Sequence, residues 1–234
     1  MIGTLKKLFK KEKSNLENKE REAMKKVLYI TANPKEESQS YSLEAGRKFL
    51  DLYKSQNPQD EIVELDLYNL DIPFIDDDVF KGWGKLGAGV AFEELSETEK
   101  FKVGAINTYT EQFIDADKYI FVTPMWNLSL PPKVKVYVDT LMIAGKTFHY
   151  TEQGPEGLLK DKKAFHIHAT GGVYSNPTLE HMEFGNSYLK TVLGFMGVND
   201  FNSVLLEGTA MAGDDPSLIK NKAIDEINEK VVTF

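Results

Sequence analysis

Short apolar runs alternate with longer amphipathic stretches from Lys26 to the end of the chain. This alternation is typical of β-α units that repeat around a parallel sheet. Near-continuous apolar runs such as Tyr119-Ile120-Phe121-Val122 indicate strands that helices cover on both faces. We therefore expect an α/β fold with five parallel strands, at residues 27–31, 61–67, 118–124, 163–170 and 200–207. The helices are predicted at residues 42–55, 97–114, 132–144, 178–196 and 217–232.

Two predicted connections are long for a compact domain, and long loops of this kind usually have a task. Residues 71–96 are rich in Asp and Gly, and Asp76-Asp77-Asp78 is expected in a solvated loop because the ligand spacing of a calcium loop is absent. In residues 147–159, the run Thr-Phe-His-Tyr-Thr followed by Gly-Pro-Glu-Gly predicts an added β-hairpin.

The first 25 residues differ in composition from the rest, because lysine and arginine outnumber glutamate there. We predict that residues 1–25 form a flexible N-terminal extension and that residues 26–234 form one domain. The alternative for the extension is a short amphipathic helix, since Leu5, Leu8, Phe9 and Leu16 have near-helical spacing.

Charge and composition exclude several classes of function. A net charge of -8 argues against a nucleic-acid partner, because the chain would repel a phosphate backbone. The sequence has no cysteine, so redox chemistry must use a bound cofactor. No metal site is predicted at His166 and His168, because a histidine pair without a placed carboxylate usually packs in a strand. No apolar run approaches the roughly 20 residues of a membrane span, and a cytoplasmic location is expected.

The loop after the first predicted strand, Asn33 to Ser42, enters a helix and is rich in hydroxyl groups. A helix N-terminus offers unpaired N–H groups and a partial positive charge, to which Ser40 and Ser42 would add donors. Ordinary N-capping by serine explains the same residues. Neither a dinucleotide-binding glycine fingerprint nor a nucleoside-triphosphate loop is present, so a single phosphate ester fits this entrance best.

The loops after the third and fourth predicted strands would complete a site at the same edge of the sheet. Thr123-Pro124-Met125-Trp126-Asn127-Leu128 combines a flat ring with an amide, as a planar redox ring requires, although Met125 and Trp126 could simply pack in the core. Gly171 and Gly172 allow close approach of the main chain to a ligand. The three loops together indicate FMN.

Several stretches together match a known family. They are Val-Leu-Tyr-Ile-Thr-Ala-Asn-Pro from Val27, Ser40-Tyr41-Ser42, Thr-Pro-Met-Trp-Asn-Leu from Thr123, Ala-Gly-Lys-Thr-Phe-His-Tyr-Thr-Glu-Gln-Gly-Pro-Glu-Gly-Leu from Ala144, and Ala-Thr-Gly-Gly from Ala169. Over residues 25–234 the chain resembles the FMN-dependent NADH-azoreductases of the flavodoxin-like quinone reductase superfamily. The resemblance implies a flavodoxin-like three-layer α/β/α sandwich with strand order 2-1-3-4-5 in the predicted numbering.

The same resemblance implies a homodimer with FMN at the subunit interface. NADH would reduce tightly bound FMN, which would then reduce quinones or azo compounds in a ping-pong cycle. The implied cofactor-binding residues are Asn33, Ser40, Tyr41, Ser42, Pro124, Met125, Trp126, Asn127, Leu128, Ala169, Thr170, Gly171 and Gly172. Tyr150, Tyr174 and Asn127 would line the substrate pocket, and no residue is expected to act as a general base.

This chain departs from some relatives in having Asn33 in place of serine and Thr170 in place of arginine. The preferred acceptor and the choice between NADH and NADPH stay open. The alternatives are an NAD(P)H:FMN reductase that releases reduced flavin, a flavodoxin-type electron carrier, and an FMN-free descendant of the fold. The long connections at residues 71–96 and 147–159 argue against a small carrier, because they can enclose a second ligand.

Overall fold

A five-stranded parallel sheet forms the centre of the molecule. The structure, a computed structural model, describes residues 24–213, 215 and 217–234. The predicted flexible extension, up to residue 23, and its alternative, a helix around Leu5 to Leu16, therefore lie outside the described residues. The strands are β1 (Lys26–Thr31), β2 (Glu61–Asp66), β3 (Lys118–Pro124), β6 (Lys163–Ala169) and β7 (Asp200–Leu206). Their order is β2-β1-β3-β6-β7. This confirms the predicted order 2-1-3-4-5, because the two strands of the hairpin take the labels β4 and β5.

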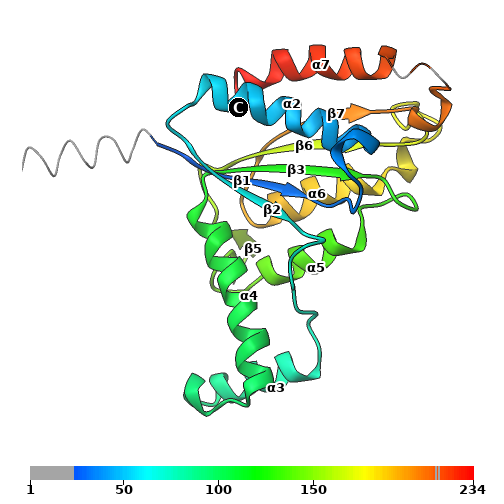
Figure 1. Ribbon diagram of the computed structural model, residues 1–234. Helices are drawn as coiled ribbons and strands as arrows, with labels where there is room; N and C mark the ends of the chain where they lie inside the picture. Colours follow the sequence, from blue (N-terminus) through cyan, green and yellow to red (C-terminus); the bar gives the residue numbers. More distant parts are fainter. Residues whose placement is uncertain (1–23, 214, 216) are drawn as a thin grey trace, which may run out of the picture.

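Helices cover both faces of the sheet, as the apolar strands require (Figure 1). Helices α2 (Tyr41–Gln56) and α7 (Ser217–Val231) lie on one face, and α4 (Glu97–Asp115), α5 (Pro132–Leu141) and α6 (Phe184–Phe195) on the other. Successive side chains of a strand point to opposite faces, so Tyr29 packs in the core under α2 whereas Ile30 packs in the core under α4 to α6. The flavodoxin-like three-layer sandwich is confirmed.

Residues 71–96 are not the loop that the sequence predicted, because they contain α3 (Asp77–Gly87). The Asp76 side chain caps this helix by accepting from the Val79 N–H, and Lys102 on α4 pairs with Asp76 and Asp78 at 2.5 and 2.6 Å. Aspartates that resembled a solvated loop are therefore an N-terminal cap and the first turn of a helix. Together α3 and α4 project from the body of the molecule (Figure 1).

Two predicted helices are shorter than expected. The helix predicted at 132–144 ends at Leu141, because the Thr147 hydroxyl donates to the Leu141 carbonyl at 2.6 Å and ends the hydrogen-bond ladder. The helix predicted from 178 begins at Phe184, where the Glu183 carboxylate accepts from the N–H groups of the first turn. Short 3-10 turns occupy η1 (Glu37–Gln39), η2 (Phe92–Glu94), η3 (Glu180–Met182) and η4 (Thr209–Met211).

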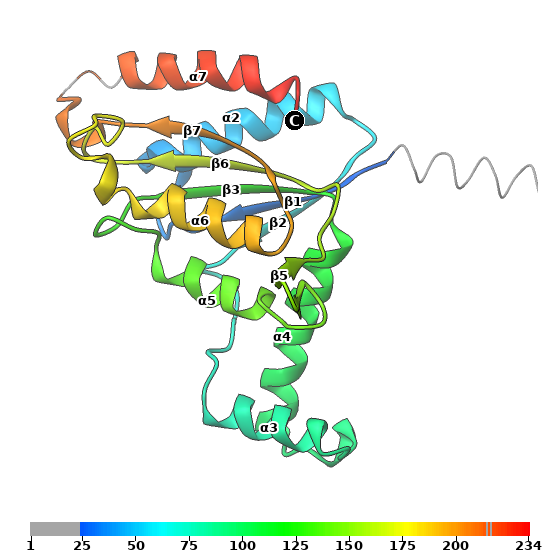
Figure 2. The ribbon, with the colours of Figure 1, turned by 180° about the vertical axis from the view of Figure 1, so that it is seen from behind.

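The predicted hairpin is confirmed as β4 (Phe148–Thr151) and β5 (Gly154–Gly157), which pair antiparallel. It packs where α6 leads into β7, because the Leu159 N–H donates to the Met196 carbonyl at 2.9 Å. The hairpin therefore lies near the amino ends of β6 and β7, away from the carboxyl ends of the strands (Figures 1 and 2). Among the helices of the described residues, none combines the length and the apolar content that a transmembrane helix needs.

Candidate functional site

A cavity of about 240 Å³ opens at the carboxyl edge of the sheet, beyond the ends of β1, β3 and β6. The loops that follow these strands surround it, as the sequence predicted for the crevice of a doubly wound sheet. Its lining residues are Asn33, Lys35, Gln39, Ser40, Tyr41, Ser42, Pro124, Met125, Trp126, Ala169, Gly171 and Thr209. Asn127, Leu128, Thr170 and Gly172 lie in the same loops, next to these lining residues.

The entrance of α2 supplies a polar wall of the cavity. Ser40 is the N-cap of the helix, and its hydroxyl accepts from the Leu43 N–H at 3.3 Å and from the Asn33 amide at 2.8 Å. The Ser42 hydroxyl, fully buried, lies 3.2 Å from that of Ser40. Ser40 therefore caps the helix and lines the cavity at once, so the two interpretations of the serines do not exclude each other.

The loop after β3 makes a tight turn. The Trp126 N–H donates to the Ser129 carbonyl at 2.8 Å, and the Ser129 N–H returns to the Trp126 carbonyl at 3.1 Å. Asn127 and Leu128 have left-handed φ values of 49° and 70°, a conformation that asparagine tolerates better than leucine. The turn leaves Asn127 exposed and places the Trp126 ring at the cavity, 6.0 Å from the Tyr68 ring centroid.

Three residues that line the cavity were missed as site residues by sequence reasoning. Lys35 and Gln39 lie within the hydroxyl-rich loop, but neither carries the hydroxyl group by which the sequence pattern predicts a phosphate site. Thr209 follows β7, and its N–H and hydroxyl both donate to the Thr170 carbonyl at 3.0 Å. The strand-end rule applied to the fifth strand as well would have found Thr209.

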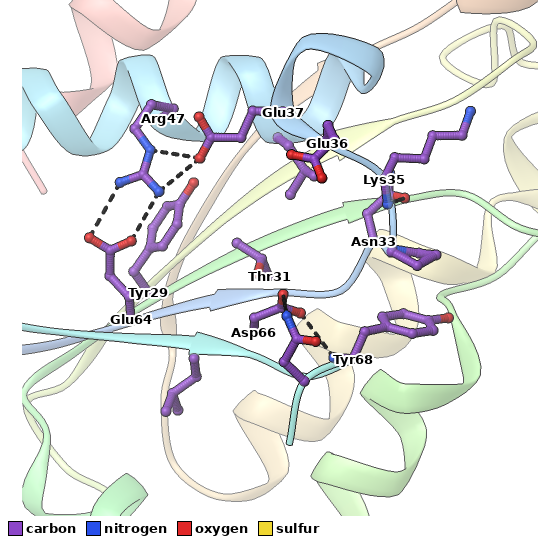
Figure 3. A pocket seen from close by; sticks show the side chains of 14 residues that line it. Tyr29, Thr31, Asn33, Lys35, Glu36, Glu37, Arg47, Glu64, Asp66 and Tyr68 are labelled. Carbon is purple, nitrogen blue, oxygen red and sulfur yellow. Dashed lines mark hydrogen bonds and ion pairs between the residues drawn. The ribbon is translucent and has the colours of Figure 1, made fainter. Parts of the chain in front are cut away.

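A second, larger cavity of about 510 Å³ shares Asn33 and Lys35 with the first. Figure 3 shows the side chains that line this second cavity. Arg47 on α2 borders it, donating from Nε to Glu37 at 2.9 Å and from both terminal nitrogens to Glu64. This hydrogen bonding with Arg47 holds the pKa of Glu64 below its usual range. Arg47 therefore ties the loop that carries Glu37 to α2 and β2.

Two buried histidines, His166 and His168, lie on the face of β6 toward α6. The Thr123 hydroxyl is 2.9 Å from His166 Nε2 and 2.8 Å from His168 Nδ1, and His166 Nδ1 is 2.8 Å from Asn186 Oδ1. Burial, together with the neighbouring His168, lowers the pKa of His166 to about 3. Among the described residues no group of three or more His, Cys, Asp or Glu side chains is placed to hold a metal ion.

We expect this histidine to make the fold acid-sensitive. Folding lowers the pKa of His166 from its ordinary value of 6.5 to about 3. Between these pH values the unfolded state binds a proton at this histidine and the folded state does not. Its contribution to stability is complete above about pH 6.5 and is lost as the pH falls toward about 3. In urea unfolding at several pH values, the free energy of unfolding of His166→Gln should fall less steeply with falling pH than that of the wild type. Exposed His181 offers the control, and the free energy of unfolding of His181→Gln should fall with pH as steeply as that of the wild type. A wild-type pH dependence in His166→Gln would contradict the prediction.

The two tyrosines predicted for the substrate pocket lie in different places. Tyr174 follows Gly172 at the cavity edge of the sheet, and its ring packs so close that a Cβ at Gly172 would meet it at 3.2 Å. Tyr150 is 74 % exposed on β4 of the hairpin, which packs near the amino ends of β6 and β7 and so lies away from the cavity of its own chain. A single chain therefore does not bring Tyr150 to the predicted pocket.

Comparisons with known proteins agree with this architecture. The model of a family described as flavodoxin-like fold matches residues 25–231. A protein of Bacillus subtilis (strain 168) named FMN-dependent NADH:quinone oxidoreductase 2 is 52% identical over 211 residues, covering 90% of this chain and all of that protein. One of Geobacillus kaustophilus (strain HTA426), named FMN-dependent NADH:quinone oxidoreductase, is 53% identical over the same length and coverage.

Solved structures are similar as well. An FMN-dependent NADH-azoreductase from Bacillus anthracis str. Ames Ancestor, in complex with FMN, superposes with a TM-score of 0.84 at 34% identity, covering 90% of this chain and 99% of that one. The chain therefore belongs to the flavodoxin-like fold family, in the branch of the FMN-dependent NADH:quinone oxidoreductases and azoreductases. This confirms the resemblance that the strand-end motifs indicated.

Proposed function

We propose that this protein is an FMN-dependent oxidoreductase that takes two electrons from NADH and reduces quinones and aromatic azo compounds. The observation that carries the proposal is the convergence of a capped helix entrance, an aromatic turn and a glycine loop on one cavity. The relatives' names support the same activity, since they combine FMN, NADH and quinone or azo reduction.

The residues around the cavity fit FMN. Its phosphate would lie at the entrance of α2, where first-turn N–H groups, the Ser40 and Ser42 hydroxyls and the Lys35 ammonium offer donors to an anion. Its ring would lie between the Trp126 turn and the glycine loop, because Gly171 leaves the backbone accessible to a flat ligand. Asn33, Tyr41, Ser42, Pro124, Met125 and Ala169 complete the proposed cofactor site.

When bound, FMN supplies two-electron hydride chemistry between NADH and the acceptor. The protein positions the rings and excludes water, and reacting atoms must approach to about 3–3.5 Å. The main-chain N–H groups and the Asn127 amide would polarise the ring edge, because charge that grows during reduction is stabilised by fixed donors. We propose that Leu128, Thr170 and Gly172 hold the backbone that presents these donors.

A homodimer would resolve the position of Tyr150. Its hairpin lies near the amino ends of β6 and β7, away from the cavity of its own chain, so a second copy would bring Tyr150 to a substrate pocket at the interface. The projecting α3 and α4 expose Phe80 and Phe101 by 63 % and 56 %, and aromatic side chains are enriched in protein interfaces.

We also propose that the enzyme acts in the cytoplasm, where NADH is available as donor. We propose further that residues 26–234 form its single domain.

Light scattering after size exclusion should give about twice the mass of one chain. A charge in the exposed aromatic surface would have to be desolvated, so we expect Phe80→Glu to shift the protein to monomer and to lower quinone turnover at least tenfold. Leu218→Glu, at a position 80 % exposed on α7, serves as control and should remain dimeric. A monomeric wild-type protein with full turnover would refute the dimer.

The function is tested by purifying the protein, recording its visible spectrum and mixing it anaerobically with NADH, then with menadione or an azo dye. We expect flavin absorbance that bleaches with NADH and returns as the acceptor is consumed. Absence of flavin after reconstitution with FMN would end the proposal. Release of reduced flavin would indicate an NAD(P)H:FMN reductase, and flavin reduction without acceptor turnover would indicate an electron carrier.

A further inference from the structure

The loop after β7 is hydrogen-bonded to the loop after β6 residue by residue. The N–H groups of Gly208, Thr209 and Ala210 donate to the carbonyls of Gly172, Thr170 and Gly171 at 2.9, 3.0 and 3.2 Å. Gly208 has a φ of 76°, which favours glycine, and this lets the chain turn toward the glycine loop. The glycine loop therefore depends on the β7 loop for its conformation.

Glu207, at the start of this β7 loop, adds two hydrogen bonds of a different kind. Its Oε1 accepts from the N–H groups of both Tyr174 and Ser175, each at 2.6 Å. Hydrogen bonds from N–H groups to a carboxylate are shorter and stronger than those between neutral groups. One carboxylate oxygen thus fixes two successive peptide units just after the glycine pair.

The side chain that these peptide units carry is Tyr174. A Cβ placed on Gly172 would lie 3.2, 3.6 and 3.7 Å from three atoms of the Tyr174 ring and hydroxyl, so this side chain lies directly over the glycine. Gly171, the preceding residue, lines the cavity. The position of the ring at the cavity edge is therefore set by the backbone that Glu207 holds.

We propose that Glu207 is a positioning residue for the acceptor pocket, acting through Tyr174. The proposal rests on the proposed function, in which Tyr174 walls the pocket where NADH and the quinone meet the flavin. Glu207 binds neither cofactor nor substrate. It keeps the Tyr174 ring over Gly172, so that an aromatic acceptor meets a preformed wall and does not have to order the loop as it binds.

The first test is independent of activity. Hydrogen–deuterium exchange of the peptide that contains Tyr174 and Ser175 should be at least tenfold faster in Glu207→Ala, because both amides lose their acceptor. Glu207→Gln keeps an oxygen at the same position and should restore most of the protection. The matched control is Glu229→Ala, at an exposed position on α7, which should exchange like wild type.

The second test is kinetic. We expect Glu207→Ala to raise the KM for menadione about tenfold. Its dissociation constant for FMN and its Tm should match those of the control Glu229→Ala. In a double-mutant cycle, Glu207→Ala should add less than twofold to the effect of Tyr174→Ala, because one side chain acts through the other. Glu207→Gln should return KM to within threefold of wild type.

Additive effects of the two variants would overturn the proposal, as would unchanged amide exchange in Glu207→Ala. Loss of FMN or general destabilisation in Glu207→Ala would also overturn it, because Glu207 would then support the whole fold and not the acceptor wall. A wild-type protein without bound flavin or menadione turnover would instead refute the proposed function. The exchange experiment would still report on the hydrogen bonds in that case.

Discussion

Replacing Ser40 and Ser42 together with alanine is expected to raise the dissociation constant for FMN on the order of 100-fold. Each hydrogen bond to a charged group is worth about 1.5 kcal/mol at the low end, and two such losses correspond to a factor of this size. The Asn33 amide, which donates to the Ser40 hydroxyl at 2.8 Å, would also lose its acceptor. Fluorescence titration of the apoprotein with FMN measures the effect directly, since flavin emission changes on binding.

The control must separate phosphate binding from helix capping, because Ser40 is also the N-cap of α2. Ser96 caps α4 in a capping box with Glu99, away from the cavity, so Ser96→Ala removes a comparable cap worth about 1 kcal/mol. We expect Ser96→Ala to lower thermal stability and leave FMN affinity unchanged. Wild-type FMN affinity in the double serine variant would rule out the proposed phosphate site.

Replacing Gly157 with alanine is expected to destabilise the fold by about 3 kcal/mol, the upper part of the range for overpacking. A Cβ there would lie 2.1 Å from the Gly197 nitrogen and 2.3 Å from the Met196 carbonyl carbon. These are backbone atoms, which cannot rotate away, so the hairpin would separate from the turn that leads into β7. For a chain of this size the loss corresponds to a fall in Tm of about 10 °C, measurable by differential scanning fluorimetry.

Gly84 on α3 offers the matched substitution, because a Cβ there would meet nothing within 4 Å. Gly84→Ala should be neutral or stabilise by about 0.5–1 kcal/mol, since alanine loses less entropy in a helix interior. If Gly157→Ala had the same Tm as Gly84→Ala, the inferred close contact between the hairpin and the Met196–Gly197 turn would be contradicted. If the dimer brings Tyr150 to the pocket, Gly157→Ala should also lower quinone turnover in proportion to the fraction of misplaced hairpin.

The sheet could be predicted because its apolar runs are covered on both faces, and a buried strand such as Tyr119 to Val122 has little freedom to be anything else. Strand ends then located the three loops at one edge, which predicted most of the cavity lining. Helix α3 was missed because Asp76 to Asp78 have low helix propensity in isolation. Their role as cap and ion-pair partners of Lys102 depends on α4 packing beside them.

Local sequence pattern predicts the strands, the entrance of α2 and the motifs of the glycine and aromatic turns, because these depend on neighbours close in sequence. Which distant residues meet depends on how the helices and loops pack around the sheet. Thr209 and Glu207 lie more than thirty residues after the backbone groups they bind. Tyr150, expected at the pocket from the family resemblance, lies on a hairpin near the amino ends of β6 and β7, away from the cavity of its own chain. Hydrogen bonds between distant loops leave no periodic signal in a sequence, so they become visible only once the sheet has brought its edges together.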